Sequence, residues 1–163
     1  MQFSIQREAL LKPLQQVIGV VERRQTLPVL ANLLVKVGDG KVSLTGTDLE
    51  VEMVASTSAE KLADGEITIP ARKLFDIVRA LPDGAQIDLK LNGDRVALNA
   101  GRSRFTLTTL AASEFPTVDE IELVETVSLP EQVLRDLMEH TSFAMANQDV
   151  RYYLNGMLLD RSE

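Results

Sequence analysis

The carboxylates of the segment TGTDLEVE (45–52) are the first candidates for chemistry in this chain of 163 residues. Asp48, Glu50 and Glu52 could hold a metal ion or act as a general acid and base. A catalytic pair needs an apolar pocket and a partner group, and the sequence indicates neither. A structural interpretation is favoured, in which Asp48 stabilises a turn and Glu50 and Glu52 face solvent on one side of a strand. The apolar residues opposite them are Leu49, Val51 and Met53.

Other catalytic chemistry is largely excluded by composition. The chain has no cysteine, so disulfides, thiolate metal sites and a cysteine nucleophile are ruled out. Its single histidine, His140, excludes a multi-histidine zinc site and is interpreted as an ordinary residue at a helix end. No glycine-rich phosphate loop or GxSxG motif is present. By elimination, the sequence indicates a scaffold or binding module rather than an enzyme.

The segment AGRSRFTLTTL (100–110) concentrates positive charge on a predicted strand. Arg102 and Arg104 alternate with Ser103 and Phe105, so both guanidinium groups should project from one face. One interpretation is a charged edge strand that is protected against aggregation. The other is an edge that pairs with an acidic surface of another subunit. The spacing alone leaves both open.

These residues lie in a degenerate internal repeat. Each of two copies reads as a strand, a helix and three strands, and a third copy begins before the sequence ends. Residues 3–21 hold the first strand and helix, and the helices predicted after them are 71–81 and 131–146. The predicted strands are 29–37, 41–46, 49–55, 66–70, 86–91, 95–100, 104–110, 126–130 and a run from Tyr152. Residues 56–65 read as a loop, and the acidic, proline-containing residues 112–125 as an interdomain linker.

Both helices of the complete copies have an apolar face and a basic or polar one. Pro13 should lie in a first turn or mark a kink. The apolar faces consist of Leu10, Leu14, Val17, Ile18 and Val21 in the first helix and Leu74, Phe75, Val78 and Leu81 in the second. The opposite face of the first helix carries Lys12, Gln15, Gln16 and Arg23. The opposite face of the second helix carries Arg72, Lys73, Asp76 and Arg79.

The net charge of −7 is regional. Residues 114–139 contain eight acidic residues and one basic residue, so the rest of the chain is balanced and can still carry a basic patch. No apolar run is long enough for a membrane span, and the first residues do not resemble a signal peptide. The length predicts one domain or slightly more, and a soluble cytoplasmic protein is expected.

Six blocks in order resemble one family. LLKPLQQV, TLPVLANLL, SLTGTDLEVEMVA, TIPARKLFDI, AGRSRFTLTTLAASEFP and QDVRYYLNGMLL together are similar to the bacterial DNA polymerase III beta subunit family, the sliding clamps, from Met1 to about Leu159. The resemblance implies an α+β DNA clamp fold, built from a duplicated strand-helix-three-strand unit with helices on one side of antiparallel sheets. It implies a complete first clamp domain at 1–120 and the start of a truncated second domain at 121–163.

The resemblance also implies a function. Members of this family are noncatalytic processivity factors without cofactors, homodimeric rings that encircle duplex DNA of any sequence and tether the polymerase. The implied partners are DNA, the DNA polymerase III alpha subunit and the clamp loader. The alternative is a stand-alone clamp-like domain that binds full-length clamp or replication proteins. The implied DNA-facing residues are Lys12, Arg23, Arg24, Arg72, Arg79, Gln148 and Arg151. The implied dimer interface comprises Lys73, Arg102, Arg104, Phe105 and Leu107. The resemblance also implies that Leu154 forms one wall of a pocket for partner peptides.

Overall fold

The computed structural model describes residues 1–21, 27–117 and 126–160, without the side chains of residues 61 and 62. The chain divides into two compact units, Met1–Asp119 and Glu120–Glu163, and each is described by itself. No helix in the described part is long and apolar enough to cross a membrane.

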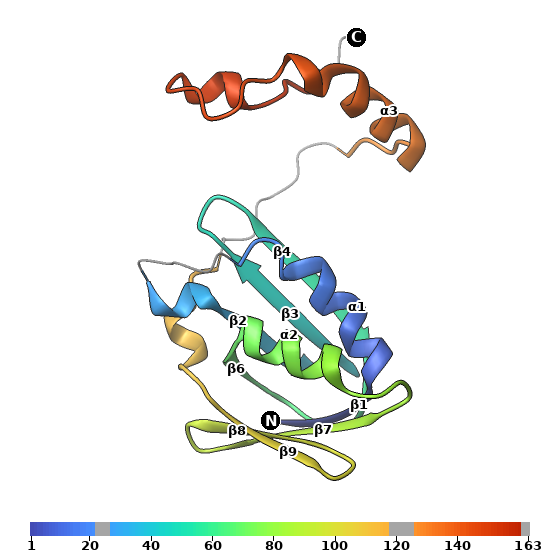
Figure 1. Ribbon diagram of the computed structural model, residues 1–163, viewed down its shortest axis with the longest axis vertical. Helices are drawn as coiled ribbons and strands as arrows, with labels where there is room; N and C mark the ends of the chain where they lie inside the picture. The colour runs from blue at the N-terminus through green and yellow to red at the C-terminus, as the bar shows by residue number, and fades with distance from the viewer. Residues whose placement is uncertain (22–26, 118–125, 161–163) are drawn as a thin grey trace. The chain divides into compact units, whose positions relative to one another are not determined.

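The first unit contains two copies of a strand, a helix and a three-stranded antiparallel group, as the sequence predicts (Figure 1). The first copy comprises β1 (Gln2–Gln6), α1 (Arg7–Val17), the 3-10 helix η1 (Pro28–Ala31), β2 (Asn32–Gly38), β3 (Lys41–Thr47) and β4 (Glu52–Ser58). The short strand β5 (Glu60–Ala63) then precedes the second copy. The second copy comprises β6 (Gly65–Pro70), α2 (Ala71–Ala80), β7 (Gln86–Asn92), β8 (Arg95–Ala100), β9 (Ser103–Thr108) and the 3-10 helix η2 (Ala112–Glu114).

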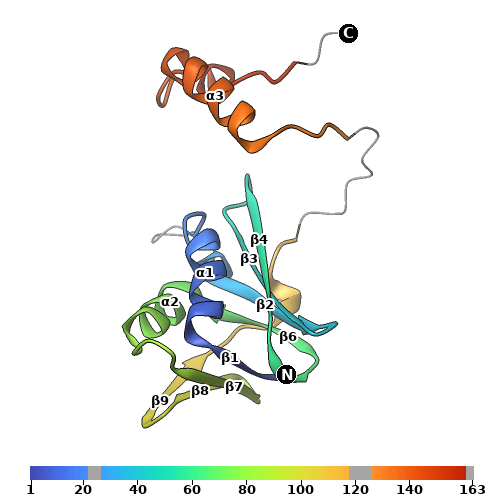
Figure 2. The same cartoon turned by 90° about the vertical axis from the view of Figure 1, so that its right-hand side faces the viewer.

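The two copies exchange their first strands. The strands form two antiparallel sheets, in the orders β5-β1-β7-β8-β9 and β4-β3-β2-β6 (Figures 1 and 2). β1 pairs with β7 of the second copy, with Ile5 opposite Ile87. β6 in turn pairs with β2 of the first copy, with Ile69 opposite Leu33. Each sheet therefore contains strands from both copies.

The two helices bury the apolar faces that their spacing predicts. α1 and α2 contact each other, and α1 also contacts β3 and β4 whereas α2 contacts β2 and β6. Leu14 of α1 and Val78 of α2 are fully buried. Phe75 is half-buried and packs against the same core. Pro13 lies in the interior of α1 and is buried, so of the two expected alternatives, a first-turn position or a kink, the first is wrong. Position 13 donates no N–H to the helix.

A buried polar contact connects β6 with the segment after β9. The Asn32 side-chain amide donates a hydrogen bond to Thr68 Oγ1 at 2.8 Å. The Thr68 hydroxyl donates to the Leu110 carbonyl at 2.9 Å and accepts from the Leu110 N–H at 3.1 Å. Thr68 is fully buried, and its hydroxyl both donates and accepts. These hydrogen bonds connect the four-stranded sheet to the segment that follows β9 of the five-stranded sheet.

Three predicted boundaries in the first unit are wrong. The strand expected at 29–37 begins at Asn32, because Pro28 opens a 3-10 turn. The strand expected at 49–55 runs from Glu52 to Ser58 instead. The expected loop at 56–65 contains the end of β4 and all of β5, which pairs with β1. The polar residues of this segment alternate poorly in hydropathy, so their pairing depends on neighbouring strands.

The second unit has one α-helix and two 3-10 turns in its described part. They are α3 (Glu131–Thr141), η3 (Ser142–Ala144) and η4 (Tyr152–Asn155). The predicted helix at 131–146 is confirmed in its first 11 residues. The strands predicted at 126–130 and from Tyr152 are wrong, since the first is irregular and the second begins as a 3-10 turn. A strand needs a neighbouring strand to bond with, and no strand occurs among residues 126–160.

Candidate nucleic-acid and subunit surfaces

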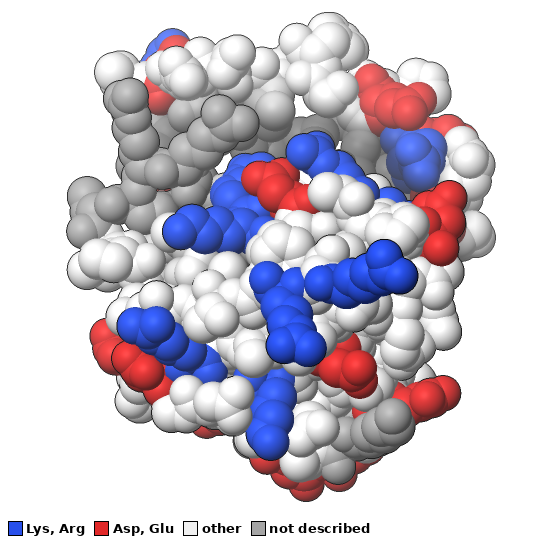
Figure 3. All heavy atoms as spheres, turned by 60° about the horizontal axis from the view of Figure 1, so that its bottom comes forward, with Lys and Arg blue, Asp and Glu red and all other residues white. Residues whose placement is uncertain are grey.

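The outer faces of α1 and α2 carry three of the expected DNA-facing cations. Lys12, Arg72 and Arg79 are all exposed, because the residues on the opposite side of each helix fill the core. Figure 3 shows Lys and Arg side chains gathered in the middle of one face, with most Asp and Glu toward its rim. A basic region therefore exists on a protein whose net charge is −7.

Arg72 has a structural contact as well. Its guanidinium donates a hydrogen bond to the Val21 carbonyl beyond the end of α1 at 2.9 Å. At the opposite end of the helix pair, Arg7 of α1 donates to the carbonyls of Val78 and Arg79 in the last turn of α2, at 3.1 and 2.9 Å. An arginine near the start of each helix thus binds backbone carbonyls of the other, in its last turn for α2 and just beyond its end for α1.

Arg7 is a residue that the sequence analysis missed. An arginine in the first turn of a helix faces the positive end of that helix's own dipole, which is unfavourable. The unfavourable position is the signal in the sequence that could have identified Arg7. A cation at such a position is stabilised when it binds the carbonyl end of another helix. Arg7 also forms an ion pair with Asp83 at 2.8 Å. The neighbouring Glu8 accepts the Gly84 N–H, and this bond holds the pKa of the Glu8 carboxyl below its ordinary value.

Arg79 is held in a local arrangement on α2. Its guanidinium pairs with Asp76 at 3.0 Å and lies 5.3 Å from the centre of the Phe75 ring. The pair is largely exposed, with both side chains more than half accessible, so its contribution to stability is small. Arg79 therefore remains available to a polyanion, although Asp76 reduces the local positive charge.

Two of the expected DNA-facing arginines, Arg23 and Arg24, lie outside the described residues. Two other expected DNA-facing residues, Gln148 and Arg151, are exposed in the second unit. Gln148 adopts a left-handed backbone conformation, with φ of 58°. Arg151 donates to both oxygens of Asp149 at 3.0 Å. This contact lowers the pKa of the Asp149 carboxyl and raises that of the Arg151 guanidinium.

The expected subunit surface on β9 is only partly available. Arg104 lies on β9 and Arg102 in the turn before it, after Gly101 with φ of 57°. Both arginines are exposed, as is Lys73 on α2. Phe105 is half-buried against the core. Leu107 does not fit the expectation, because it is only 6% exposed and belongs to the core of its own unit.

The TDLEVE carboxylates form a turn rather than a reactive site. Asp48 Oδ1 accepts the N–H groups of Glu50 and Val51 at 2.9 and 2.7 Å. These bonds hold the pKa of the Asp48 carboxyl below its ordinary value, that from Val51 most strongly. The Thr47 hydroxyl accepts the Leu49 N–H at 3.0 Å. Among the described residues, no group of three or more metal-binding side chains comes together.

The inward-facing orientation expected for the apolar residues of this segment is wrong. Leu49, Val51 and Met53 are 57%, 51% and 38% exposed. The turn between β3 and β4 extends past the end of α1 in both ribbon views (Figures 1 and 2), so the helix does not cover it. Alternation predicted the two faces of the strand but could not show where the covering helix ends.

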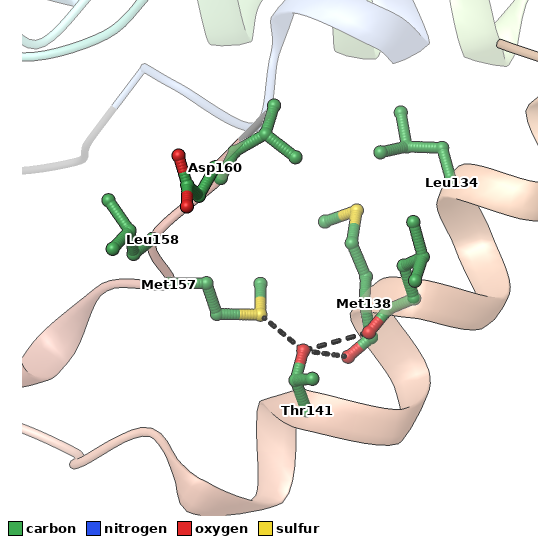
Figure 4. Close-up of a pocket in the computed structure, with 8 residues that line it drawn as sticks. Leu134, Met138, Thr141, Met157, Leu158 and Asp160 are labelled. Carbon is green, nitrogen blue, oxygen red and sulfur yellow. Dashed lines mark hydrogen bonds between the residues drawn. The ribbon is translucent and has the colours of Figure 1, made fainter. Parts of the chain in front are cut away.

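The expected pocket wall, Leu154, is half-buried in η4. A cavity of about 440 Å³ in the second unit lies between α3 and residues 157–160, and Leu154 does not line it (Figure 4). There the Thr141 hydroxyl donates to the Leu137 carbonyl at 2.8 Å and lies 3.3 Å from the sulfur of Met157. His140, in the last turn of α3, forms a hydrogen bond with the Asp136 carbonyl at 2.7 Å.

Comparison with known proteins identifies one family over nearly the whole chain. The model of the DNA polymerase III beta subunit N-terminal domain matches residues 1–119. The beta sliding clamp of Pseudomonas putida is 61% identical over 163 residues, which cover 99% of this chain and 44% of that relative. The beta sliding clamp of Escherichia coli strain K12 is 53% identical over 161 residues. This chain thus spans less than half the length of the curated relatives it matches.

Solved structures agree with the sequence comparison. A crystal structure of the sliding clamp from Pseudomonas aeruginosa, bound to griselimycin, has a TM-score of 0.92 and 58% identity. The match covers 96% of this chain and 43% of the Pseudomonas aeruginosa chain. The DNA polymerase III beta subunit of Caulobacter crescentus has a TM-score of 0.91 at 41% identity. The α+β fold predicted from the resemblance is confirmed, and the chain belongs to the DNA polymerase III beta subunit family.

Proposed function

We propose that this chain forms the first domain and the beginning of the second domain of a sliding clamp. Such a clamp is a noncatalytic, homodimeric ring that encircles duplex DNA in the bacterial cytoplasm and keeps the replicative polymerase on its template. The similarity to curated beta sliding clamps along nearly the whole chain carries this proposal. The chain covers 44% of those relatives, so the complete ring needs sequence that corresponds to their remaining length.

The exposed cations of α1 and α2 support a loose contact with DNA. Lys12, Arg72 and Arg79 project from two adjacent helices, and Arg23, Arg24, Gln148 and Arg151 are proposed to join them on the DNA side. Phosphate contacts are independent of sequence. About four of them lose roughly a hundredfold in affinity between 50 and 200 mM salt. Retention by a closed ring does not depend on such affinity, whereas an open chain has no other means of staying on DNA.

The exposed basic side chains of β9 and α2 support a subunit contact. Arg102, Arg104 and Lys73 are proposed to face an acidic surface of another clamp subunit, with the half-buried Phe105 at the edge of the apolar centre. Leu107 is left out of this proposal because it is buried. Leu154 is proposed as one wall of a docking pocket for the polymerase alpha subunit and the clamp loader.

A chimera tests the proposal most directly. The corresponding residues of a full-length clamp at 61% identity are replaced by this chain, and the product is loaded on nicked circular DNA. The expected result is retention on the circle through gel filtration and increased polymerase processivity. A folded, dimeric chimera that dissociates from circular DNA as fast as from linear DNA would contradict it.

Matched variants of the chimera locate the DNA-facing surface. Lys12→Ala/Arg79→Ala removes two cations from α1 and α2, whereas Lys36→Ala/Lys41→Ala removes two exposed cations from β2 and β3. Only the first pair should reduce the salt dependence of DNA affinity, by a slope of about two in log K against log salt. If both pairs gave the same slope of log K against log salt, α1 and α2 would not form the DNA-facing surface.

The alternative, a clamp-like interaction module, is favoured by one observation, the exposed basic residues near the start of β9. Native mass spectrometry of this chain mixed with a full-length clamp decides it. A mixed complex that Arg102→Glu/Arg104→Glu abolishes would support the module. The 163-residue chain alone should not remain on circular plasmid at moderate salt. If it stayed on the plasmid through gel filtration, the proposal that a ring needs the remaining sequence of the relatives would be wrong.

A further inference from the structure

The tripeptide LNG occurs twice in this chain, at residues 91–93 and 154–156. Its asparagines are Asn92, the last residue of β7, and Asn155, the last residue of η4. A glycine has no Cβ to shield its backbone nitrogen, so that nitrogen can attack the carboxamide of the asparagine before it. An asparagine that precedes glycine is therefore prone to lose ammonia and become an acid. Since both copies have the same sequence, their surroundings decide which one reacts in the folded chain.

The carboxamide of Asn92 is unrestrained. Asn92 is exposed, and no described residue forms a hydrogen bond with its side chain. Gly93 follows with a φ of 61°, as is typical of the first central residue of a two-residue hairpin turn. Apart from the residues next to Gly93 in the chain, no atom lies within 4 Å of the place where its Cβ would be. The hairpin tip therefore has room for a ring formed from Asn92 and Gly93.

The carboxamide of Asn155 is held at both of its ends. Its Oδ1 accepts the N–H of Asp149 at 2.9 Å, and its Nδ2 donates to the carbonyl of the same residue at 3.0 Å. The Asn155 side chain is also half-buried. Both hydrogen bonds must break before the carboxamide can turn toward the nitrogen of Gly156, so the folded structure opposes the reaction at Asn155.

We propose that Asn92 is the site at which the folded chain undergoes spontaneous deamidation. The Gly93 nitrogen loses its proton and bonds to Asn92 Cγ, the Cγ–Nδ2 bond breaks, and ammonia leaves. The product is a succinimide ring, which water then opens at either of its carbonyl carbons. Opening at Cγ leaves an ordinary aspartate. Opening at the main-chain carbonyl carbon leaves an isoaspartate, whose backbone runs through Cβ and Cγ. Water is consumed, ammonia is released, and nothing is oxidised or reduced.

The two products differ in their effect on the hairpin. An aspartate at position 92 lies opposite Arg95 in the β7–β8 register, and opposite charges across a strand pair attract. An isoaspartate lengthens the backbone by one atom just before the turn. In the turn, the Asp94 carbonyl accepts the N–H of Thr109 at 3.1 Å and its hydroxyl at 2.8 Å. A longer backbone shifts this carbonyl, so the isoaspartate should release the segment that follows β9.

Peptide mapping by mass spectrometry tests the proposal on the 163-residue chain after storage in mildly alkaline buffer. In the folded chain Asn92 should deamidate roughly tenfold faster than Asn155, because two hydrogen bonds hold only the second carboxamide. In concentrated urea the two rates should become equal, because the tripeptides are identical. Asn92→Gln should abolish the fast reaction. Asn155→Gln is the matched control and should leave the rate at Asn92 unchanged.

Hydrogen exchange separates the effects of the two products. In the isoaspartyl form, purified from the stored sample, the Thr109 N–H should exchange faster than in the unaltered chain. Asn92→Asp has the structure of the aspartyl product and should keep the protection of the unaltered chain. Equal rates at Asn92 and Asn155 in the folded chain, or an Asn92 that reacts only in urea, would overturn the proposal. An isoaspartate that leaves the protection of Thr109 unchanged would overturn the predicted release. These measurements need neither DNA nor another subunit, so their outcome is independent of the sliding-clamp proposal.

Discussion

The helices α2 and α3 have similar amphipathic sequences but different surroundings. Leu74 and Val78 of α2 are almost fully buried, and α2 contacts the four-stranded sheet and α1. Leu134 and Leu137 of α3 are 40% and 51% exposed. The comparison shows that periodicity specifies which face of a helix requires burial but does not supply the partner that buries it. In the described part of the second unit, α3 is helical without a buried residue.

Hydrogen exchange should show the largest difference between the two units. Amides of β2, β3 and β8 should exchange only on global unfolding, because these strands are flanked on both sides. Amides of residues 131–160 should exchange faster by several orders of magnitude, because little apolar burial opposes local opening. Mass spectrometry of peptic fragments measures both. If amides of the two units were equally protected from exchange, α3 would have to be buried against a partner, and the contrast between α2 and α3 would not hold.

Truncating one leucine in each unit should give the next largest difference. Leu98→Ala on β8 removes a fully buried side chain and should lower the free energy of unfolding by about 2–5 kcal/mol. Leu137→Ala on α3 should change the unfolding of the first unit by less than about 0.5 kcal/mol. Urea denaturation followed by circular dichroism provides the values. Similar losses for both variants would show that the units unfold together.

Thr68→Val tests the contact that fastens the two sheets of the first unit. It leaves the Asn32 amide and the Leu110 N–H without the hydroxyl that they bond, and should cost about 1–3 kcal/mol. Thr106→Val on β9 is the matched control, because that residue is exposed, and should stay within about 0.5 kcal/mol. Urea denaturation of both proteins checks this. A neutral Thr68→Val would mean that the contact contributes little to stability.

The smallest effect concerns acid stability. The pKa of Glu8 is lowered in the folded protein, so its contribution is present above the ordinary value of 4.5 and is lost as the pH falls through the lower folded pKa. Glu8→Gln should therefore reduce the loss of stability on acidification from pH 6 to pH 3, as measured by urea midpoints. Asp149→Asn removes a carboxyl whose pKa is also lowered, but in the second unit. It should leave the midpoint of the first unit unchanged at every pH.

Local patterns were sufficient to predict the helices and the repeat. Leu10, Leu14 and Val17 recur at helical spacing, and all three are fully buried. The exchange of β1 and β6 could not be predicted, because alternation assigns a face to each strand but not a neighbour. The exposure of Leu49 and Val51 depends on where α1 ends, and the strand expected from Tyr152 depends on neighbours that residues 126–160 do not supply.

The candidate site was predictable in residue type but not in contacts. The exposure of Lys12, Arg72 and Arg79 follows from the apolar face opposite them. The bond from Arg72 to the Val21 carbonyl, and the pair of carbonyls bound by Arg7, join residues more than 50 positions apart. Nothing local encodes such contacts. The family resemblance assigned Leu107 to an interface, although alternation along β9 also fits the core position that it occupies.

The strand exchange between the two copies has a consequence for synthesis on the ribosome. β1 is made first, yet Ser4 finds its hydrogen-bond partner in Asp88, 84 positions later. Neither sheet is complete until strands from both copies have left the exit tunnel. Contacts between such distant residues slow folding, because a long loop must close before they form. β1 therefore has only the short strand β5 to pair with until β7 has been made. The first unit is expected to fold late and as one cooperative whole rather than copy by copy.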